Sequence, residues 1–111
     1  MKRDPLKFRV TTPRVVLYFY DGMKHIIIKV TGKVQGVFFR AMAKAKADEL
    51  GIKGFVRNQS DNSVYAEAEG NDEQLNEFIA WCQQGSRLGH VERCEVEEGN
   101  GAGFSEFTIQ R

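Results

Sequence analysis

The sequence predicts an α+β fold, a ferredoxin-like split βαβ sandwich in which two helices cover one face of an antiparallel sheet. Two observations lead to this prediction. Short β-branched runs alternate with two stretches in which apolar residues recur at helical spacing, and glycines or capping residues bound both stretches. The resulting order is β-α-β-β-α-β with one closing strand, and 111 residues suffice for one such core but not for a second full domain.

The first strand and the first helix follow residue 23. Residues 26–31 are apolar and β-branched, as is typical of a buried strand, and Gly32 is expected to end it. Apolar side chains then recur at i, i+3, i+4, i+8 and i+11, which predicts an amphipathic helix over 39–50 with Gly51 at its C′ position. The apolar stripe consists of Phe39, Met42, Ala43, Ala47 and Leu50.

A hairpin is predicted in the middle of the chain. Residues 54–58 and 64–69 form two short strands around a turn at 60–62, where Asn62 tolerates the left-handed conformation that a tight turn requires. Alternation along the second strand puts its apolar residues on one face, and these are Val64, Ala66 and Ala68.

The second helix begins at a capping box and is followed by the last two strands. Asn71 is the expected N-cap, Gln74 lies three residues later, and the helix runs until Gly85. Its apolar face consists of Leu75, Phe78, Ile79 and Cys82. Strands are expected at 91–96 and 104–109, and because Val91 and Val96 fall on opposite faces by parity, a bulge or bend is expected between them.

Residues 1–22 are predicted to be an N-terminal extension to a domain at 23–111. This segment carries two prolines among scattered basic residues and shows no helical period. The run at 15–20 could add an edge strand, or the segment could be disordered, and the sequence leaves both alternatives open.

Composition excludes several classes of protein. Lys and Arg number 16 against 15 for Asp and Glu, which gives no electrostatic basis for nucleic-acid binding. No run approaches the ~20 apolar residues of a membrane span, and no signal peptide is evident, so we expect a cytoplasmic protein without membrane partners. We also expect a monomer, although the sequence does not determine the oligomeric state. Cys82 and Cys94 lack metal-ligand spacing. They are expected to be reduced thiols, or a disulfide in an oxidising compartment, and no metal or cofactor is expected.

The segment that joins the first strand to the first helix is the most informative. Gly32 and Gly36 bracket a short loop whose backbone N–H groups can converge on one anion, and the helix amino terminus behind the loop adds partial positive charge. Arg40 follows in the first helical turn, and its planar guanidinium can hold two phosphate oxygens at once. The segment therefore predicts a phosphate site.

Two motifs carry a resemblance to a known family. The loop reads Gly-x-Val-Gln-Gly-Val-x-Phe-Arg over residues 32–40, and residues 54–58 read Gly-Phe-Val-Arg-Asn. Together they resemble the acylphosphatase signature, and the resemblance extends from residue 24 to about residue 109. It implies an enzyme that hydrolyses acyl phosphates to a carboxylate and inorganic phosphate.

The same resemblance implies roles for individual residues. Asn58 would orient the attacking water, and the phosphoryl group would be bound by the loop amides and the motif arginine, at Gln35, Gly36, Val37, Phe38, Phe39 and Arg40. Physical chemistry agrees for Asn58, since a neutral amide has no useful basicity but offers both a donor and an acceptor to a water. The motifs contain no evident nucleophile or base, which is consistent with the direct attack by water that the resemblance implies.

Two alternatives come from other classes of protein. Residues 53–57 partly imitate the start of an RNA-binding RNP1 motif, but they fall on the second strand of the domain, whereas that motif occupies the third. A catalytically idle domain of the same fold is the other alternative, and the presence of both Arg40 and Asn58 weighs against it.

Overall fold

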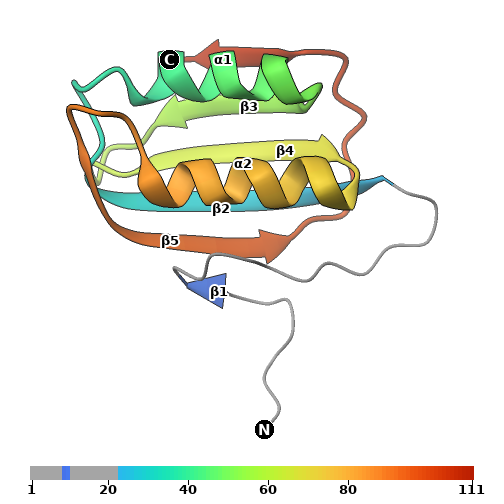
Figure 1. Ribbon diagram of the computed structural model, residues 1–111, viewed down its shortest axis with the longest axis horizontal. Helices are drawn as coiled ribbons and strands as arrows, with labels where there is room; N and C mark the ends of the chain where they lie inside the picture. The colour runs from blue at the N-terminus through green and yellow to red at the C-terminus, as the bar shows by residue number, and fades with distance from the viewer. Residues whose placement is uncertain (1–8, 11–22) are drawn as a thin grey trace, which may run out of the picture.

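The computed structural model describes residues 9–10 and 23–111, so the predicted edge strand at 15–20 lies outside the described residues. Both helices cover the same face of one sheet, as predicted (Figure 1). The elements are β1 (Arg9–Val10), β2 (Lys24–Lys33), α1 (Phe39–Leu50), β3 (Lys53–Asn58), β4 (Val64–Gly70), α2 (Asp72–Gln84), β5 (His90–Glu98) and β6 (Phe107–Gln110). No helix in the described part of the chain is long and apolar enough to cross a membrane.

The sheet has the strand order β1-β5-β2-β4-β3-β6, and the predicted ferredoxin-like fold with its antiparallel sheet is confirmed except at one edge. The exception is β6, which pairs with β3 in parallel, whereas the other neighbours are antiparallel. After β5 the chain crosses the end of the sheet and enters β6 at the end where β3 also begins (Figure 1). The direction of β6 therefore follows from the path of this connection.

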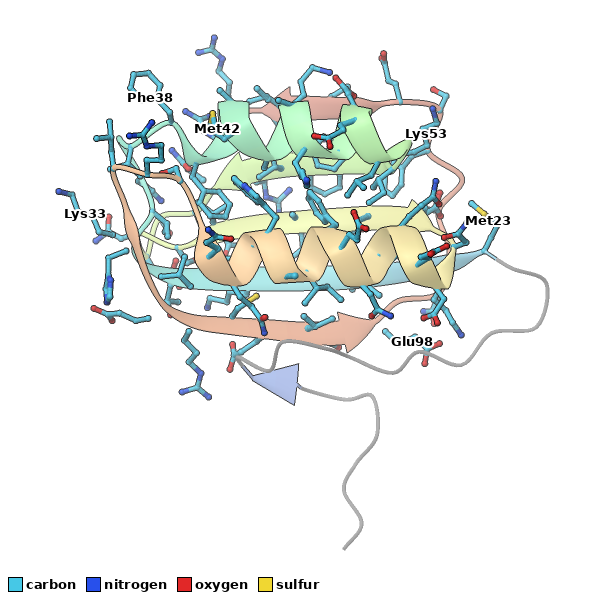
Figure 2. The ribbon with its side chains drawn as sticks, viewed as in Figure 1. Met23, Lys33, Phe38, Met42, Lys53 and Glu98 are labelled. Atoms are coloured by element: carbon cyan, nitrogen blue, oxygen red, sulfur yellow. The ribbon has the colours of Figure 1, made fainter. Side chains whose placement is uncertain are left out.

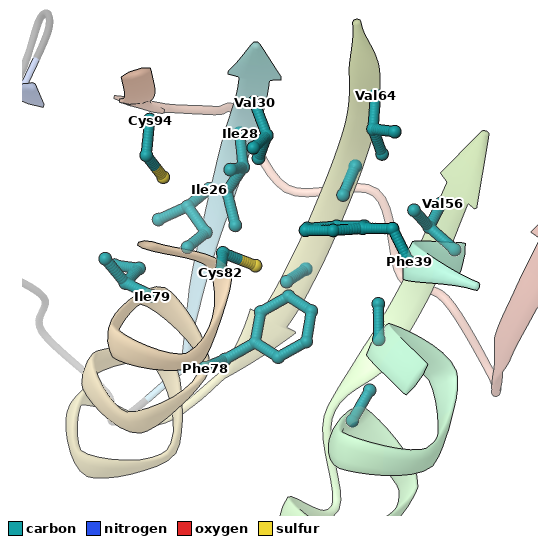
Figure 3. Close-up of a cluster of buried hydrophobic side chains, with 14 of the residues drawn as sticks. Ile26, Ile28, Val30, Phe39, Val56, Val64, Phe78, Ile79, Cys82 and Cys94 are labelled. Atoms are coloured by element: carbon teal, nitrogen blue, oxygen red, sulfur yellow. The ribbon is translucent and has the colours of Figure 1, made fainter. Parts of the chain in front are cut away.

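The core lies between the helices and the sheet, and it contains the apolar faces that the periodicity predicts. Alternate residues of β2 and β4 point toward the helices and are buried, as are the inward faces of α1 and α2 (Figure 3). Met42 is the exception, because it is exposed. The buried stripe of α1 is narrower than predicted and contains Phe39, Ala43 and Ala47. Met42 therefore lies beside this stripe and not within it.

Two predicted strand limits were wrong, each because of contacts with a segment that is distant in sequence. Gly32 does not end β2 but lies inside it, opposite a bulge that leaves Glu92 as the extra residue of β5. This is the irregularity expected between Val91 and Val96. The last strand begins at Phe107 instead of 104, because the backbone N–H groups of residues 102–104 donate to the carboxylate of Glu69 and not to a strand.

Gly32 is required at the bulge by close approach of backbone. Its φ is 125°, and a Cβ built there would lie 2.3 Å from the carbonyl oxygen of His90. Any other residue would have to displace β5.

The helix and turn signals of the sequence are confirmed. The Asn71 side chain accepts from the Gln74 backbone N–H, and the Gln74 side chain accepts from the Asn71 backbone N–H. Gly51 ends α1 in the left-handed conformation, and Asn62 takes a φ of 73° in the hairpin turn. Local sequence thus determines the start of α2 and the end of α1.

Both cysteines are free and buried in the core. Burial raises the pKa of the Cys94 thiol to about 12 and raises that of Cys82 as well, so both thiols are protonated at neutral pH.

Candidate active site

The loop between β2 and α1 has the backbone geometry of an anion nest. Gly36 and Phe38 have φ values of 74° and 65°, whereas Val37 between them does not have a positive φ. Such alternation turns successive N–H groups toward one concavity. The buried side chains of Val34 and Val37 anchor the loop to the core.

Two side-chain hydrogen bonds hold the loop in this conformation. Gln35 Nε2 donates to the carbonyl oxygens of Gln59 and Ser63, each at 2.8 Å, so it ties the loop to the hairpin directly after β3. Ser86 Oγ donates to the Val37 carbonyl oxygen at 2.8 Å from the segment that follows α2. The loop is therefore fixed from two sides.

The amino terminus of α1 faces the site without a cap. Its N-cap residue, Phe38, makes no side-chain capping bond, and the first turn contains no acidic residue. By contrast, α2 has a capping box and two acidic residues, Asp72 and Glu73, in its first turn. The free N–H groups and the helix dipole of α1 therefore remain directed at whatever lies in front of the loop.

Arg40 and Asn58 meet at this helix end. Both line a cavity of about 300 Å³, together with Val34, Gly36, Phe38, Phe39, Ala41 and Ile109. Asn58 is the last residue of β3 and lies on the helix-facing side of the sheet by alternation with Val56. Arg40 Nη1 donates to the Gln110 carbonyl oxygen at 3.3 Å, which links the guanidinium to the end of β6.

The side-chain oxygen of Asn58 is buried but accepts no hydrogen bond from another protein group. A buried polar atom without a partner is costly, and native proteins keep few of them. Here the atom belongs to a residue that lines the cavity beside Arg40. The wall of the cavity therefore contains a buried acceptor that no protein group satisfies.

Most but not all of the predicted residues line the cavity. Gly36, Phe38, Phe39, Arg40 and Asn58 do. Gln35 and Val37 are not among the lining residues, and Gln35 uses its side chain to anchor the loop. Sequence analysis missed Ile109, Gln110 and Ser86, which come from remote segments and carry no local signal.

In the part of the chain that the structure describes, no group of three or more His, Cys, Asp or Glu side chains could hold an ion. The expectation that the site uses no metal stays a prediction. The cavity lining itself includes one permanently charged side chain, that of Arg40. The Arg40 guanidinium and the uncapped amino terminus of α1 both place positive charge at the cavity.

Comparison with known proteins assigns the family. The acylphosphatase family model matches residues 26–109. An acylphosphatase of a Nocardioides species is 43% identical over 90 residues, which cover 81% of this chain and 91% of that protein. The solved acylphosphatase of Coxiella burnetii superposes with a TM-score of 0.78 at 32% identity, covering 80% of this chain and 94% of that one. That of Bacillus subtilis gives 0.76 at 32% identity and covers 80% and 99%.

The chain therefore belongs to the acylphosphatase family. The function of this family is the hydrolysis of acyl phosphates, and the chain is accordingly an enzyme of the hydrolase class.

Proposed function

We propose that the chain hydrolyses the carboxyl–phosphate anhydride bond of small acyl phosphates in the cavity between loop 34–38 and the end of β3. One observation carries the proposal: Arg40 and Asn58, from different elements, line one cavity at the uncapped amino terminus of α1. The proposal treats residues 23–111 as the catalytic domain and residues 1–22 as an extension.

The phosphoryl group is bound by the nest and by Arg40. The N–H groups of residues 35–39 and the first turn of α1 donate to its oxygens, and the guanidinium adds two parallel charge-assisted bonds. Because the nest is held by Gln35 and Ser86 before substrate arrives, these donors need little reorganisation.

Asn58 positions the attacking water. Its side-chain amide, which lines the cavity and offers both an acceptor and a donor, forms hydrogen bonds to a water placed in line with the phosphorus. Attack forms the new P–O bond while the P–O bond to the acyl group breaks. The water proton passes to a phosphate oxygen, and the products are a carboxylate and inorganic phosphate.

The rate enhancement in this proposal comes from position and electrostatics. The lining of the cavity holds no histidine, cysteine or carboxylate to act as nucleophile or base. The departing carboxylate is a stable anion, so the leaving group needs no strong general acid. Alignment of water and phosphorus and neutralisation of phosphate charge supply the catalysis.

The proposal extends to a monomeric enzyme in the cytoplasm. The free thiols of Cys82 and Cys94 are compatible with a reducing compartment.

The alternative of RNA binding is less well supported. The Phe55 ring, which would stack a base, is buried and contacts the rings of Tyr65 and Phe104. Arg57 also lies over it, 5.5 Å from the ring centroid. These neighbours surround the Phe55 ring on the face of the sheet that the helices leave uncovered, so they leave little of the ring for a base to stack on.

The test is hydrolysis of acetyl phosphate by the purified full chain, with phosphate release as the readout. Arg40→Ala should abolish both activity and the binding of inorganic phosphate. Arg93→Ala is the matched control, because Arg93 lies on β5 and pairs with Glu95 away from the cavity. A folded Arg40→Ala protein that binds phosphate unchanged would refute the assigned role.

A further inference from the structure

Exposed apolar side chains gather around the proposed phosphate site. The described residues include five large hydrophobic side chains that are exposed: Met23, Phe38, Met42, Leu88 and Ile109. Four of them line either the phosphate cavity or the groove next to it. Single exposed hydrophobic side chains are normal on protein surfaces, whereas a cluster of them is typical of a binding surface.

The groove next to the cavity is apolar and has a volume of about 400 Å³. Its walls are Phe38 from the loop, Met42 from α1 and Leu88 from the segment after α2, which are 68%, 43% and 64% exposed. Phe38 also lines the phosphate cavity, so the two hollows share this residue. Phe38 and Met42 lie at the amino end of α1, and Met23 lies at the opposite end of the molecule (Figure 2).

The groove is held in shape by the same contacts that hold the phosphate loop. Ser86 Oγ donates to the Val37 carbonyl oxygen, and the Gly89 N–H closes a turn onto the Ser86 carbonyl oxygen at 3.2 Å. This turn fixes the backbone on both sides of Leu88. A substrate would therefore meet a wall formed in advance, at little ordering cost.

Phe38 is held at a conformational cost. Its φ of 65° lies in the left-handed region, which glycine adopts freely and a bulky residue rarely does. The exposed ring gains little from burial to offset this cost. Strained residues of this kind concentrate at functional sites, and here the strain places an aromatic ring between the phosphate cavity and the groove.

We propose that the Phe38–Met42–Leu88 groove binds the acyl group of the substrate and makes the enzyme selective for acyl phosphates with extended apolar acyl groups. This inference rests on the proposed function, because the phosphoryl group must lie in the adjoining cavity. The groove lining contains no carboxylate, and its one charged residue, Arg87, is cationic and does not repel an anionic substrate. Burial of apolar acyl carbons in the groove is favourable because it removes them from water, and an acetyl group offers fewer such carbons than a longer acyl chain.

The wild-type chain tests the inference without any substitution. Acetyl phosphate and hexanoyl phosphate release carboxylates of nearly equal basicity, so a difference in kcat/KM between them reports binding of the acyl chain. Partial burial of four additional methylenes predicts a preference of about tenfold for hexanoyl phosphate. Equal kcat/KM values would overturn the inference.

The double variant Met42→Gln/Leu88→Gln tests the groove itself. The hexanoyl-to-acetyl ratio of kcat/KM should fall by about threefold to tenfold, because polar groups replace the apolar wall. Met23→Gln is the matched control, since Met23 is 58% exposed but lies far from the groove, and it should leave the ratio unchanged. A folded double variant with the wild-type ratio would place the acyl group elsewhere.

The outcomes separate the two proposals. If the wild-type chain hydrolyses neither compound, the proposed function itself fails. If it hydrolyses both, but either the wild-type preference or the fall of the ratio in the double variant is missing, only the acyl groove is refuted. Circular dichroism and cooperative unfolding establish that each variant is folded.

Discussion

Replacing Asn58 with alanine should slow hydrolysis about 10²- to 10³-fold while the protein keeps its stability, the rate loss being that of a single positioned polar group. The loss should appear mainly in kcat, because the amide orients water and does not hold the phosphate in the ground state. Arg40→Ala should differ, since it removes the phosphate contact itself and should abolish binding.

The expected stability follows from the contacts of Asn58. Its buried Oδ1 accepts no hydrogen bond from the protein, so the substitution breaks no such bond. An ordinary intramolecular hydrogen bond contributes about 1 kcal/mol, and an unsatisfied buried acceptor costs about 1–3 kcal/mol. Loss of side-chain packing opposes removal of that acceptor, and we expect a net change in unfolding free energy within about 1 kcal/mol.

Single-turnover and steady-state phosphate release, measured with chemical denaturation, check both parts of this prediction. Asn76→Ala is the matched control, because Asn76 also has a buried Oδ1 without a protein partner but lies on α2. It should keep the wild-type kcat. A folded Asn58→Ala enzyme with the wild-type kcat, or with a lost affinity for phosphate and an unchanged kcat, would refute water positioning by Asn58.

Three further predictions follow from the same structure. Turnover should persist in chelator, because the nest and Arg40 supply the positive field, and recovery of a lost rate on adding magnesium or zinc would contradict this. A chain that begins at Met23 should stay folded and keep kcat/KM within about twofold, since it loses β1 but no cavity residue; a much lower kcat/KM in a folded truncation would implicate the extension. Burial raises the pKa of Glu69, but the N–H groups of residues 102–104 outweigh burial and lower it below 4.5. Its stabilisation is therefore present above pH 4.5 and is lost as the pH falls below it. Glu69→Gln should unfold more easily at pH 7 and lose stability less steeply in acid, as urea midpoints against pH will test.

Strain and an orphaned acceptor both occur at the proposed site. Phe38 is one of two described non-glycine residues with positive φ, and Asn58 holds one of three buried side-chain atoms without a partner. Both features cost free energy that better-packed alternatives would avoid. Their coincidence at one cavity is the pattern expected where function and stability compete.

The sequence alone determined most of the secondary structure and the conformation of the loop that we propose binds phosphate, because both depend on neighbouring residues. Periodicity placed α1 and α2 with their buried faces, and the capping box at Asn71 and Gln74 set the start of α2. The loop motif and Arg40 are contiguous in the chain, so their common site could be predicted without any tertiary contact. Met42 and the start of β6 were predicted wrongly, because neighbours distant in sequence decide which residue is covered and which N–H finds a strand.

Only the tertiary structure decided the direction of β6, the meeting of Asn58 with Arg40, and the apolar groove. Each depends on segments far apart in the chain: β6 on the path taken after β5, the cavity on the register of β3 beside α1, and the groove on the turn that Ser86 ties to Val37. No local pattern encodes these contacts. They are selected by the burial of one common core, which fixes where remote segments lie once the helices close over the sheet.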